Sequence, residues 1–304
     1  YLDLSLNRLE SIRSFYFSSN MNLYHLNISH NRLEFIESKS FVLGSLKELD
    51  LSFNKLRSFS DDFFFSMQKK SFNNLRLLNL ASNKLMEIKF CSREIRRIYF
   101  QNNMLNDQRI QFKCQKYSGS IEMNINFNNI KLINSSSRFI LSEIVDLRLK
   151  NNHIELIENY TFLRLNNLIF LDLSHNNLGN KSLGNNSFKG LFYLTYFFMN
   201  NNYLNRINKH LFEDLFYLRE LYLSNNLIEI VEEDSFSKLK NLKLLDLSMN
   251  PRLKLIQNER VFSGMKSIKN FYCDPNLFIK NENVKNLKES IQTKIYKSSK
   301  TDYY

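Results

Sequence analysis

Residues 211–234 read LFEDLFYLRELYLSNNLIEIVEED and hold the pattern that decides the fold. At its centre, Leu221 and Leu223 alternate with polar residues, and Asn226 follows three residues after the second leucine. Alternation of apolar and polar residues predicts a strand with one buried face. The short amide of the asparagine can bond backbone groups where the chain leaves the strand. We therefore predict a strand-and-turn unit that cannot bury its apolar face alone.

The same unit recurs along the chain with a spacing close to 24 residues in most successive pairs. A fixed period of roughly 20–50 residues predicts stacked units that share one continuous core. We call the recurring residue the ladder asparagine and assign it a structural role. The ladder asparagines are Asn7, Asn31, Asn54, Asn83, Asn103, Asn128, Asn152, Asn176, Asn202, Asn226, Asn250 and Asn276.

Residues 41–56 (FVLGSLKELDLSFNKL), 211–234 and 236–250 (FSKLKNLKLLDLSMN) resemble the leucine-rich repeat, L-x-x-L-x-L-x-x-N-x-L. A phenylalanine recurs ten residues after the ladder asparagine, at Phe17, Phe41, Phe64, Phe162, Phe212 and Phe236. That phenylalanine and the period resemble the "typical" 24-residue repeats of Toll-like receptor ectodomains and related extracellular adhesion and matrix proteins. The resemblance implies an α/β leucine-rich-repeat solenoid, curved, of about 12 repeats, with a parallel β-sheet on its concave face.

The repeat pattern predicts one solenoid over residues 1–278 with irregular units at about 55–130, where successive ladder asparagines lie 29 and then 20 residues apart. Irregular units can carry a protruding loop, and neutral drift of a tolerant repeat explains them as well. The chain begins inside a strand, at YLDLSLN, so we expect an N-terminally truncated solenoid.

Residues 279–304 lose the leucine pattern and predict a basic amphipathic C-terminal helix or tail. Val284, Leu287, Ile291 and Ile295 follow one another at spacings of 3, 4 and 4, which gives one apolar stripe on a helix. We expect this helix to cover the end of the solenoid, and a helix lying on a membrane surface is the alternative.

The chain has 42 basic and 30 acidic residues, a net charge of +12. This charge fits a polyanionic or membrane-surface partner, although a lysine-rich composition explains it equally. It is the sole feature that points toward nucleic acid. A sulfated glycan could bind the basic cluster Lys89, Arg93, Arg96 and Arg97. No signal peptide and no apolar run of membrane-spanning length is visible, so any membrane anchor would lie outside this chain.

Glycosylation and cysteine pairing point to an extracellular or secreted location, with a cytoplasmic location as the alternative. Five Asn-x-Ser/Thr sequons mark candidate glycosylation sites, although an asparagine-rich chain also makes sequons by chance. Cys91 and Cys114 lie in adjacent irregular units, where a disulfide and two reduced thiols are both compatible with the sequence. Cys273 aligns with an inward leucine and is expected to be a buried, inert thiol. The sequons begin at Asn27, Asn134, Asn159, Asn180 and Asn185.

The sequence favours binding over catalysis. The five histidines lie in different units without ligand spacing, so we expect no metal and no cofactor. No nucleophile stands in a recognisable motif beside a base. Strand positions that alternate with the leucines should face the concave surface, where several units carry an Asp-Ser pair. Aromatic and charged residues replace that pair between the ladder residues Asn152 and Asn226, and this composition is typical of a protein-binding hot spot. The candidate ligand-binding residues are Arg148, Lys150, Phe170, Tyr196, Phe198, Tyr203, Glu220 and Tyr222.

The sequence thus predicts a protein-binding region of a cell-surface receptor or adhesion protein, with a protein ligand or co-receptor on the concave face. A secreted matrix protein that binds proteins or sulfated glycans is the first alternative. An intracellular leucine-rich-repeat scaffold is the second.

Overall fold

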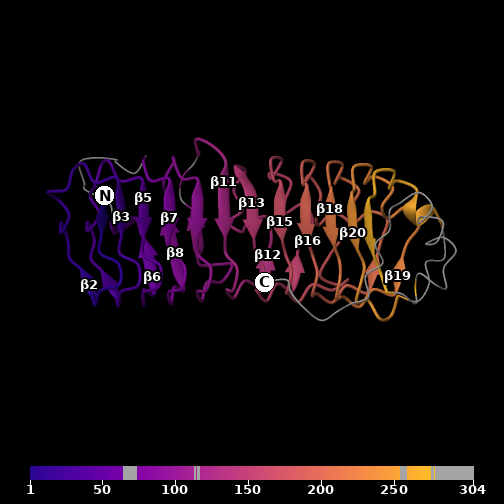
Figure 1. Cartoon of the computed structure of the whole chain (residues 1–304), viewed down its shortest axis with the longest axis horizontal. Helices are drawn as coiled ribbons and strands as arrows, with labels where there is room; N and C mark the ends of the chain where they lie inside the picture. Colours follow the sequence, from indigo (N-terminus) through magenta and orange to yellow (C-terminus); the bar gives the residue numbers. More distant parts are fainter. Residues whose placement is uncertain (64–73, 113, 115–116, 254–258, 275–276, 278–304) are drawn as a thin grey trace. The chain divides into compact units, whose positions relative to one another are not determined.

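The computed structural model describes residues 1–63, 74–112, 114, 117–253, 259–274 and 277. The chain divides into two compact units. Figure 1 colours the strands in sequence order, from indigo at the N-terminus to yellow. Unit 1 is Tyr1–Lys131 with Ser136–Arg148, and unit 2 is Leu132–Ser135 with Leu149–Tyr304. The predicted C-terminal helix, the ladder residue Asn276 and the residue Phe64 lie outside the described residues.

Each unit has a front sheet of parallel strands, one strand per repeat, which confirms the predicted solenoid. In unit 1 the order is β1 (Leu2–Asp3), β3 (His25–Asn27), β5 (Glu48–Asp50), β7 (Leu77–Asn79), β9 (Arg97–Tyr99), β11 (Ile121–Asn124) and β13 (Ile144–Arg148). In unit 2 the order is β15 (Phe170–Asp172), β16 (Tyr196–Phe198), β18 (Glu220–Tyr222), β20 (Leu244–Asp246) and β21 (Asn270–Tyr272).

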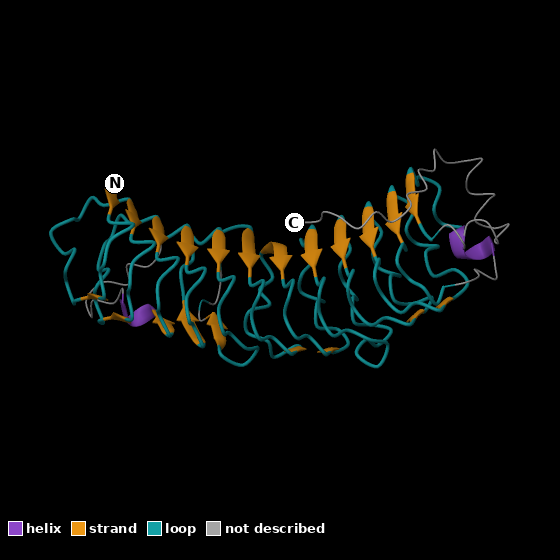
Figure 2. Ribbon diagram, turned by 60° about the horizontal axis from the view of Figure 1, so that its bottom comes forward, coloured by secondary structure: helices purple, strands orange, loops and turns teal. Residues whose placement is uncertain are grey.

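Short back strands lie on the opposite side of each unit from the front sheet (Figure 2). Unit 1 pairs β2 (Ser11–Ile12) with β4 (Phe35–Ile36), and β8 (Glu87–Phe90) with both β6 (Ser58–Ser60) and β10 (Ile110–Phe112). Unit 2 pairs β12 (Leu132–Ile133) with β14 (Leu156–Ile157), and β17 (Arg206–Ile207) with β19 (Ile230–Val231). Apart from isolated helical positions, the described residues contain two short 3-10 helices, η1 (Asp61–Phe63) and η2 (Glu259–Phe262). The α/β class expected from the family therefore takes a form dominated by strands.

The core of each unit fills the space between its front and back layers. The inward residue of a front strand, such as Leu221 in β18, is fully buried. The recurring phenylalanines form a second buried column: Phe162 stacks on Phe188 with ring centroids 6.3 Å apart, and Phe212 stacks on Phe236 at 6.1 Å. Burial of each such side chain contributes about 1.5–3 kcal/mol relative to exposure. Neighbouring repeats share these contacts, so a repeat is stable only within its stack.

The ladder asparagines bond each repeat to the one before it. Asn202 donates from Nδ2 to the carbonyl of Leu173 in the preceding repeat (2.9 Å) and to that of Met199 in its own turn (3.1 Å). Its Oδ1 accepts from the backbone N–H of Leu178, again in the preceding repeat (3.0 Å). One buried amide thereby bonds backbone N–H and C=O groups near the end of the strand that have no partner in the sheet. The same arrangement occurs at Asn31, Asn54, Asn83, Asn103, Asn128, Asn176, Asn226 and Asn250.

Unequal repeat lengths leave the front sheet in register. Leu77 of β7 pairs with Glu48 of β5, 29 residues earlier, and with Arg97 of β9, 20 residues later. The difference in length is taken up away from the front strands. The irregular units predicted at about 55–130 coincide with the back strands β6, β8 and β10.

Candidate functional site

The outward positions of the front sheet in several repeats hold an Asp-Ser pair with a structural task. Asp172 Oδ1 accepts from the backbone N–H of Ser174 (2.9 Å) and from its hydroxyl (2.6 Å). Asp246 bonds Ser248 in the same way, at 3.0 and 2.6 Å. The pair closes a turn at the end of the strand, so its recurrence follows from local hydrogen bonding.

Aromatic residues occupy outward positions in the middle strands of unit 2: Phe198 and Tyr222 stand at the aspartate position, and Phe170 and Tyr196 stand two residues earlier. In the sheet register, Phe170 lies opposite Tyr196, and Phe198 lies opposite Tyr222. The rings of Phe198 and Tyr222 stack with centroids 4.5 Å apart and planes 6° apart. Phe170 contacts Phe198 at 5.2 Å and Tyr196 at 6.3 Å. These four side chains are half-buried, largely against one another, and we call them the aromatic patch.

The aromatic patch gives up the turn bond that aspartate provides in other repeats, because phenylalanine at 198 has no side-chain acceptor for it. Loss of one hydrogen bond costs about 1 kcal/mol. A stacked aromatic pair such as Phe198–Tyr222 contributes about 0.5–1.5 kcal/mol beyond its burial, which offsets that loss. The rings are thus held rigid on an open sheet face, and little side-chain freedom remains to be lost on binding.

Polar groups border the aromatic patch. Tyr222 donates its hydroxyl to Oε2 of Glu220 at 2.9 Å, which fixes both side chains. His175 lies 3.1 Å from Asn201 (Nε2 to Nδ2). Partial burial of the His175 ring and the charge of Lys150 lower the pKa of His175 below its ordinary value. Near pH 7 the His175 imidazole is therefore neutral.

Two predicted ligand residues have other surroundings. Arg148 belongs to unit 1 and pairs within its own strand, with Nη2 2.8 Å from Oδ2 of Asp146. Tyr203 is 56% exposed but follows the ladder asparagine, where it forms an isolated parallel bridge with Gly179 instead of lying in a front strand. Sequence reasoning also missed Tyr272 of β21, which extends the outward row beyond Asp246. Tyr272 could have been found from the sequence, because it aligns with Asp246 and the other outward positions.

Members of the basic cluster at 89–97 lie on different layers of unit 1. Lys89 is in the back strand β8, with Nζ 2.6 Å from Oε1 of Glu87. Arg97 is in the front strand β9. Arg96 pairs with Glu94 at 3.6 Å, and Arg93, exposed, precedes it on the connecting turn. The fold does not gather these four charges on one surface, and it neutralises two of them.

The three cysteines take two kinds of place. Cys91 and Cys114 follow the paired back strands β8 and β10 and are joined by a disulfide, with Cα atoms 5.1 Å apart. Cys273 is 2% exposed, and burial raises the pKa of its thiol to about 12. A thiol in that environment stays protonated and unreactive.

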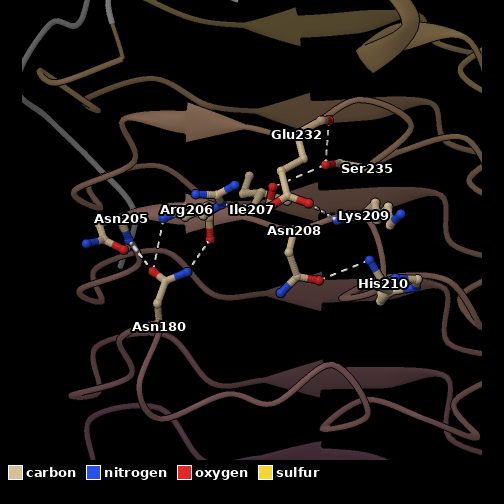
Figure 3. Close-up of polar contacts among 9 residues, drawn as sticks. All are labelled: Asn180, Asn205, Arg206, Ile207, Asn208, Lys209, His210, Glu232 and Ser235. Carbon is tan, nitrogen blue, oxygen red and sulfur yellow. Dashed lines mark hydrogen bonds and ion pairs between the residues drawn. The ribbon is translucent and has the colours of Figure 1, made fainter.

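Asn180 of the predicted glycosylation sites is fully engaged by the neighbouring repeat (Figure 3). Its Oδ1 accepts from the backbone N–H groups of Asn205 (2.6 Å) and Arg206 (3.0 Å). Its Nδ2 donates to the carbonyl of Arg206 at 2.6 Å. A glycan on this nitrogen would leave it a single N–H and would have to fit beside the backbone of Arg206.

The other sequon asparagines differ in access. Asn185 is exposed and makes no side-chain hydrogen bond within the described part of the chain. Asn159 is also exposed, and its Oδ1 accepts from the backbone N–H of Asn186 in the neighbouring repeat at 3.1 Å. Asn27 lies half-buried in β3, where its Oδ1 holds the turn at Ser29 (3.0 Å). Asn134 is half-buried.

Known proteins match this chain over its repeats. The leucine rich repeat family matches residues 1–56, 21–85 and 216–278. The chain is a leucine-rich-repeat protein. It is 27% identical over 192 residues to lumican of Mus musculus, which covers 62% of this chain and 54% of lumican. It is 29% identical over 199 residues to Tsukushi of Xenopus tropicalis (64% and 48%) and 30% identical over 212 residues to podocan of Mus musculus (60% and 33%).

These relatives are extracellular leucine-rich-repeat proteins, which confirms the resemblance drawn from the repeat class. The chain spans about half the length of the lumican and Tsukushi sequences that it matches. Among solved structures, the FLRT2 leucine-rich-repeat chain of a complex with Latrophilin 3 and Unc5D superposes with a TM-score of 0.69 at 19% identity, over 90% of this chain and 84% of that chain. Toll, in its Drosophila complex with Spatzle, gives 0.67 at 18% identity, over 89% and 38%. These two likenesses establish the fold.

Within the described residues, this leucine-rich-repeat protein has no helix long and apolar enough to cross a membrane. The same residues hold no group of three histidine, cysteine, aspartate or glutamate side chains placed for a metal ion.

Proposed function

We propose that this leucine-rich-repeat protein binds a protein ligand through the aromatic patch, as part of a cell-surface receptor or adhesion protein. The observation that carries the proposal is the unbroken ring contact from Tyr196 through Phe170 and Phe198 to Tyr222. Clustered, rigid tyrosine and phenylalanine side chains with a polar border are the composition of binding hot spots.

The way leucine-rich-repeat chains take part in complexes supports this proposal. The FLRT2 repeat domain is found in a complex with Latrophilin 3 and Unc5D, and Toll in a complex with Spatzle. From those complexes we infer only that the partner of this chain is also a protein. We assign its recognition to the front-sheet surface of unit 2. Binding rather than catalysis is the activity proposed for the described repeats.

We place the protein outside the cell or on the extracellular side of the plasma membrane. The extracellular relatives and the Cys91–Cys114 disulfide support this location, because disulfides persist in oxidising compartments. The accessible sequon at Asn185 is consistent with it. The cytoplasmic scaffold is the alternative that a reduced Cys91 and Cys114 in native material would favour.

A secreted matrix protein is the second candidate, and the similarity to lumican and podocan favours it. The two candidates share the aromatic patch and differ in how the protein is anchored. The sequence of the complete gene product distinguishes them, since a receptor requires a membrane anchor and a matrix protein does not.

The test is a binding screen of the full chain against purified extracellular domains from the same organism, followed by affinity measurement. Tyr196→Ala and Tyr222→Ala should each weaken the selected ligand at least tenfold, since hot-spot truncations cost about 2 kcal/mol. Tyr193→Ala and Tyr217→Ala are matched controls, because these exposed tyrosines stack on each other (5.1 Å) outside the front strands. Ligands that tolerate the patch variants but not the control variants would refute the assignment.

A further inference from the structure

The flank of unit 2, where the chain enters the front strands, carries a row of cations. The residues immediately before β18, β20 and β21 are Arg219, Lys243 and Lys269. All three side chains are exposed. In the described residues none of them takes part in an ion pair. The row is therefore an uncompensated positive charge at the edge of the sheet.

Backbone hydrogen bonds fix the spacing of this row. The N–H of Lys243 donates to the carbonyl of Arg219 at 2.8 Å, and the N–H of Lys269 donates to the carbonyl of Lys243 at 2.8 Å. Neighbouring strands of a sheet lie about 4.8 Å apart. The three charges are thus anchored in line over about 10 Å.

A second row runs beside the first, three residues earlier in each repeat. Lys240 and Lys266 are exposed and stand before Lys243 and Lys269. The hydroxyl of Ser267 donates to the carbonyl of Lys240 at 2.8 Å, which holds these two loops in register. The two rows together form the flank stripe, whose residues are Arg219, Lys240, Lys243, Lys266 and Lys269.

Acidic side chains do not offset the flank stripe. The three segments that carry it, 216–219 (FYLR), 240–243 (KNLK) and 266–269 (KSIK), contain no aspartate or glutamate. Glu220 follows Arg219 directly, but its carboxylate accepts the hydroxyl of Tyr222 and forms no ion pair with Arg219 among the described residues. Uncharged residues, Leu244 and Asn270, follow Lys243 and Lys269. Like charges on adjacent strands repel, which costs stability. An anionic partner that runs along the rows would remove this repulsion.

We propose that the flank stripe binds a linear sulfated polysaccharide. The site differs from the aromatic patch and does not depend on the proposed function. A protein partner fits less well, because lysine is depleted at protein interfaces and four of the five stripe residues are lysines. A membrane surface also fits less well, since Asn241 and Ser267 lie between the lysines and the exposed Phe216 and Tyr217 stand only at the Arg219 end, whereas an inserting surface requires apolar side chains along its length.

The test is retention of the full chain on immobilised heparin, with affinity measured at about 0.15 M salt. The variant Arg219→Gln, Lys243→Gln, Lys269→Gln should bind about tenfold more weakly and elute at lower salt, since three exposed ionic contacts are lost. The matched control is Arg164→Gln, Lys181→Gln, Lys209→Gln, which removes three exposed charges elsewhere in unit 2. The control should stay within about twofold of the parent chain.

A charge-preserving variant separates charge from folding. Lys243→Arg with Lys269→Arg should retain heparin binding, because the ionic contacts persist. Equal weakening by the stripe variant and the control variant would overturn the proposal, since net charge alone would then explain binding. Stripe-dependent binding to phosphatidylserine vesicles without binding to heparin would overturn the polysaccharide assignment and favour a membrane surface.

Discussion

Replacement of the ladder residue Asn202 by alanine tests how the repeats are joined. The variant removes the acceptor for the backbone N–H of Leu178 and the donor for the carbonyl of Leu173, at sites that are buried. Each buried polar group left without a partner costs about 1–3 kcal/mol. We therefore expect the free energy of unfolding to fall by about 2–6 kcal/mol.

Urea unfolding followed by far-ultraviolet circular dichroism measures this loss from the shift in midpoint at constant slope. Amide hydrogen exchange provides a local measurement, because the N–H of Leu178 should exchange faster in the variant than in the parent. Asn201→Gly is the matched control. Asn201 is adjacent to Asn202, has a backbone φ of 57°, and its side-chain amide contacts the exposed ring nitrogen of His175 rather than buried backbone groups. Glycine adopts that φ without strain, so the control should change stability by less than about 1 kcal/mol. Equal midpoints for Asn202→Ala and the control would refute the ladder's energetic role.

Three further predictions concern cysteine and glycan chemistry. Replacing Cys91 and Cys114 by serine should lower the free energy of unfolding by about 3 kcal/mol, because the disulfide closes a loop of 23 residues. Urea unfolding measures this loss, and an unchanged midpoint would contradict the prediction. Mass spectrometry of secreted material should show glycan at Asn185 and none at Asn180, whose amide is bonded on both atoms; the reverse occupancy would contradict the structure. Burial raises the pKa of the Cys273 thiol, so its contribution to stability is complete below the unfolded value near 9 and is lost as pH rises through about 12. Rapid iodoacetamide labelling of native Cys273 at pH 8 would show that the thiol is accessible.

Strongly periodic features of the fold could be read from the sequence. The ladder asparagines and the leucines beside them are required in every repeat, so their positions recur and predict both strand and stack. The recurring phenylalanines were predicted for the same reason. Phe188 was not among them, because it lies twelve rather than ten residues after its ladder asparagine, Asn176. Back strands of two to four residues carry no such requirement and were not predicted.

Side-chain relationships across repeats were harder to predict from the sequence. The order of outward positions placed Phe198 and Tyr222 on one face, but their stacking depends on the register between strands. Conversely, proximity in sequence suggested a basic cluster from Lys89 to Arg97 that the fold divides between its two layers. The flank stripe combines residues 24 to 26 positions apart, which only the register aligns.

The constant register of the front sheet across repeats of 29 and 20 residues has a consequence for how such chains change over time. Gene duplication or recombination can add a repeat of any nearby length, provided it supplies the leucines and the ladder amide. Segments on the back of a repeat can therefore lengthen without disturbing the side chains displayed on the front. A peptide tag or a reporter inserted into a back turn should leave the binding surface intact, which makes these turns the natural attachment points for an engineered version.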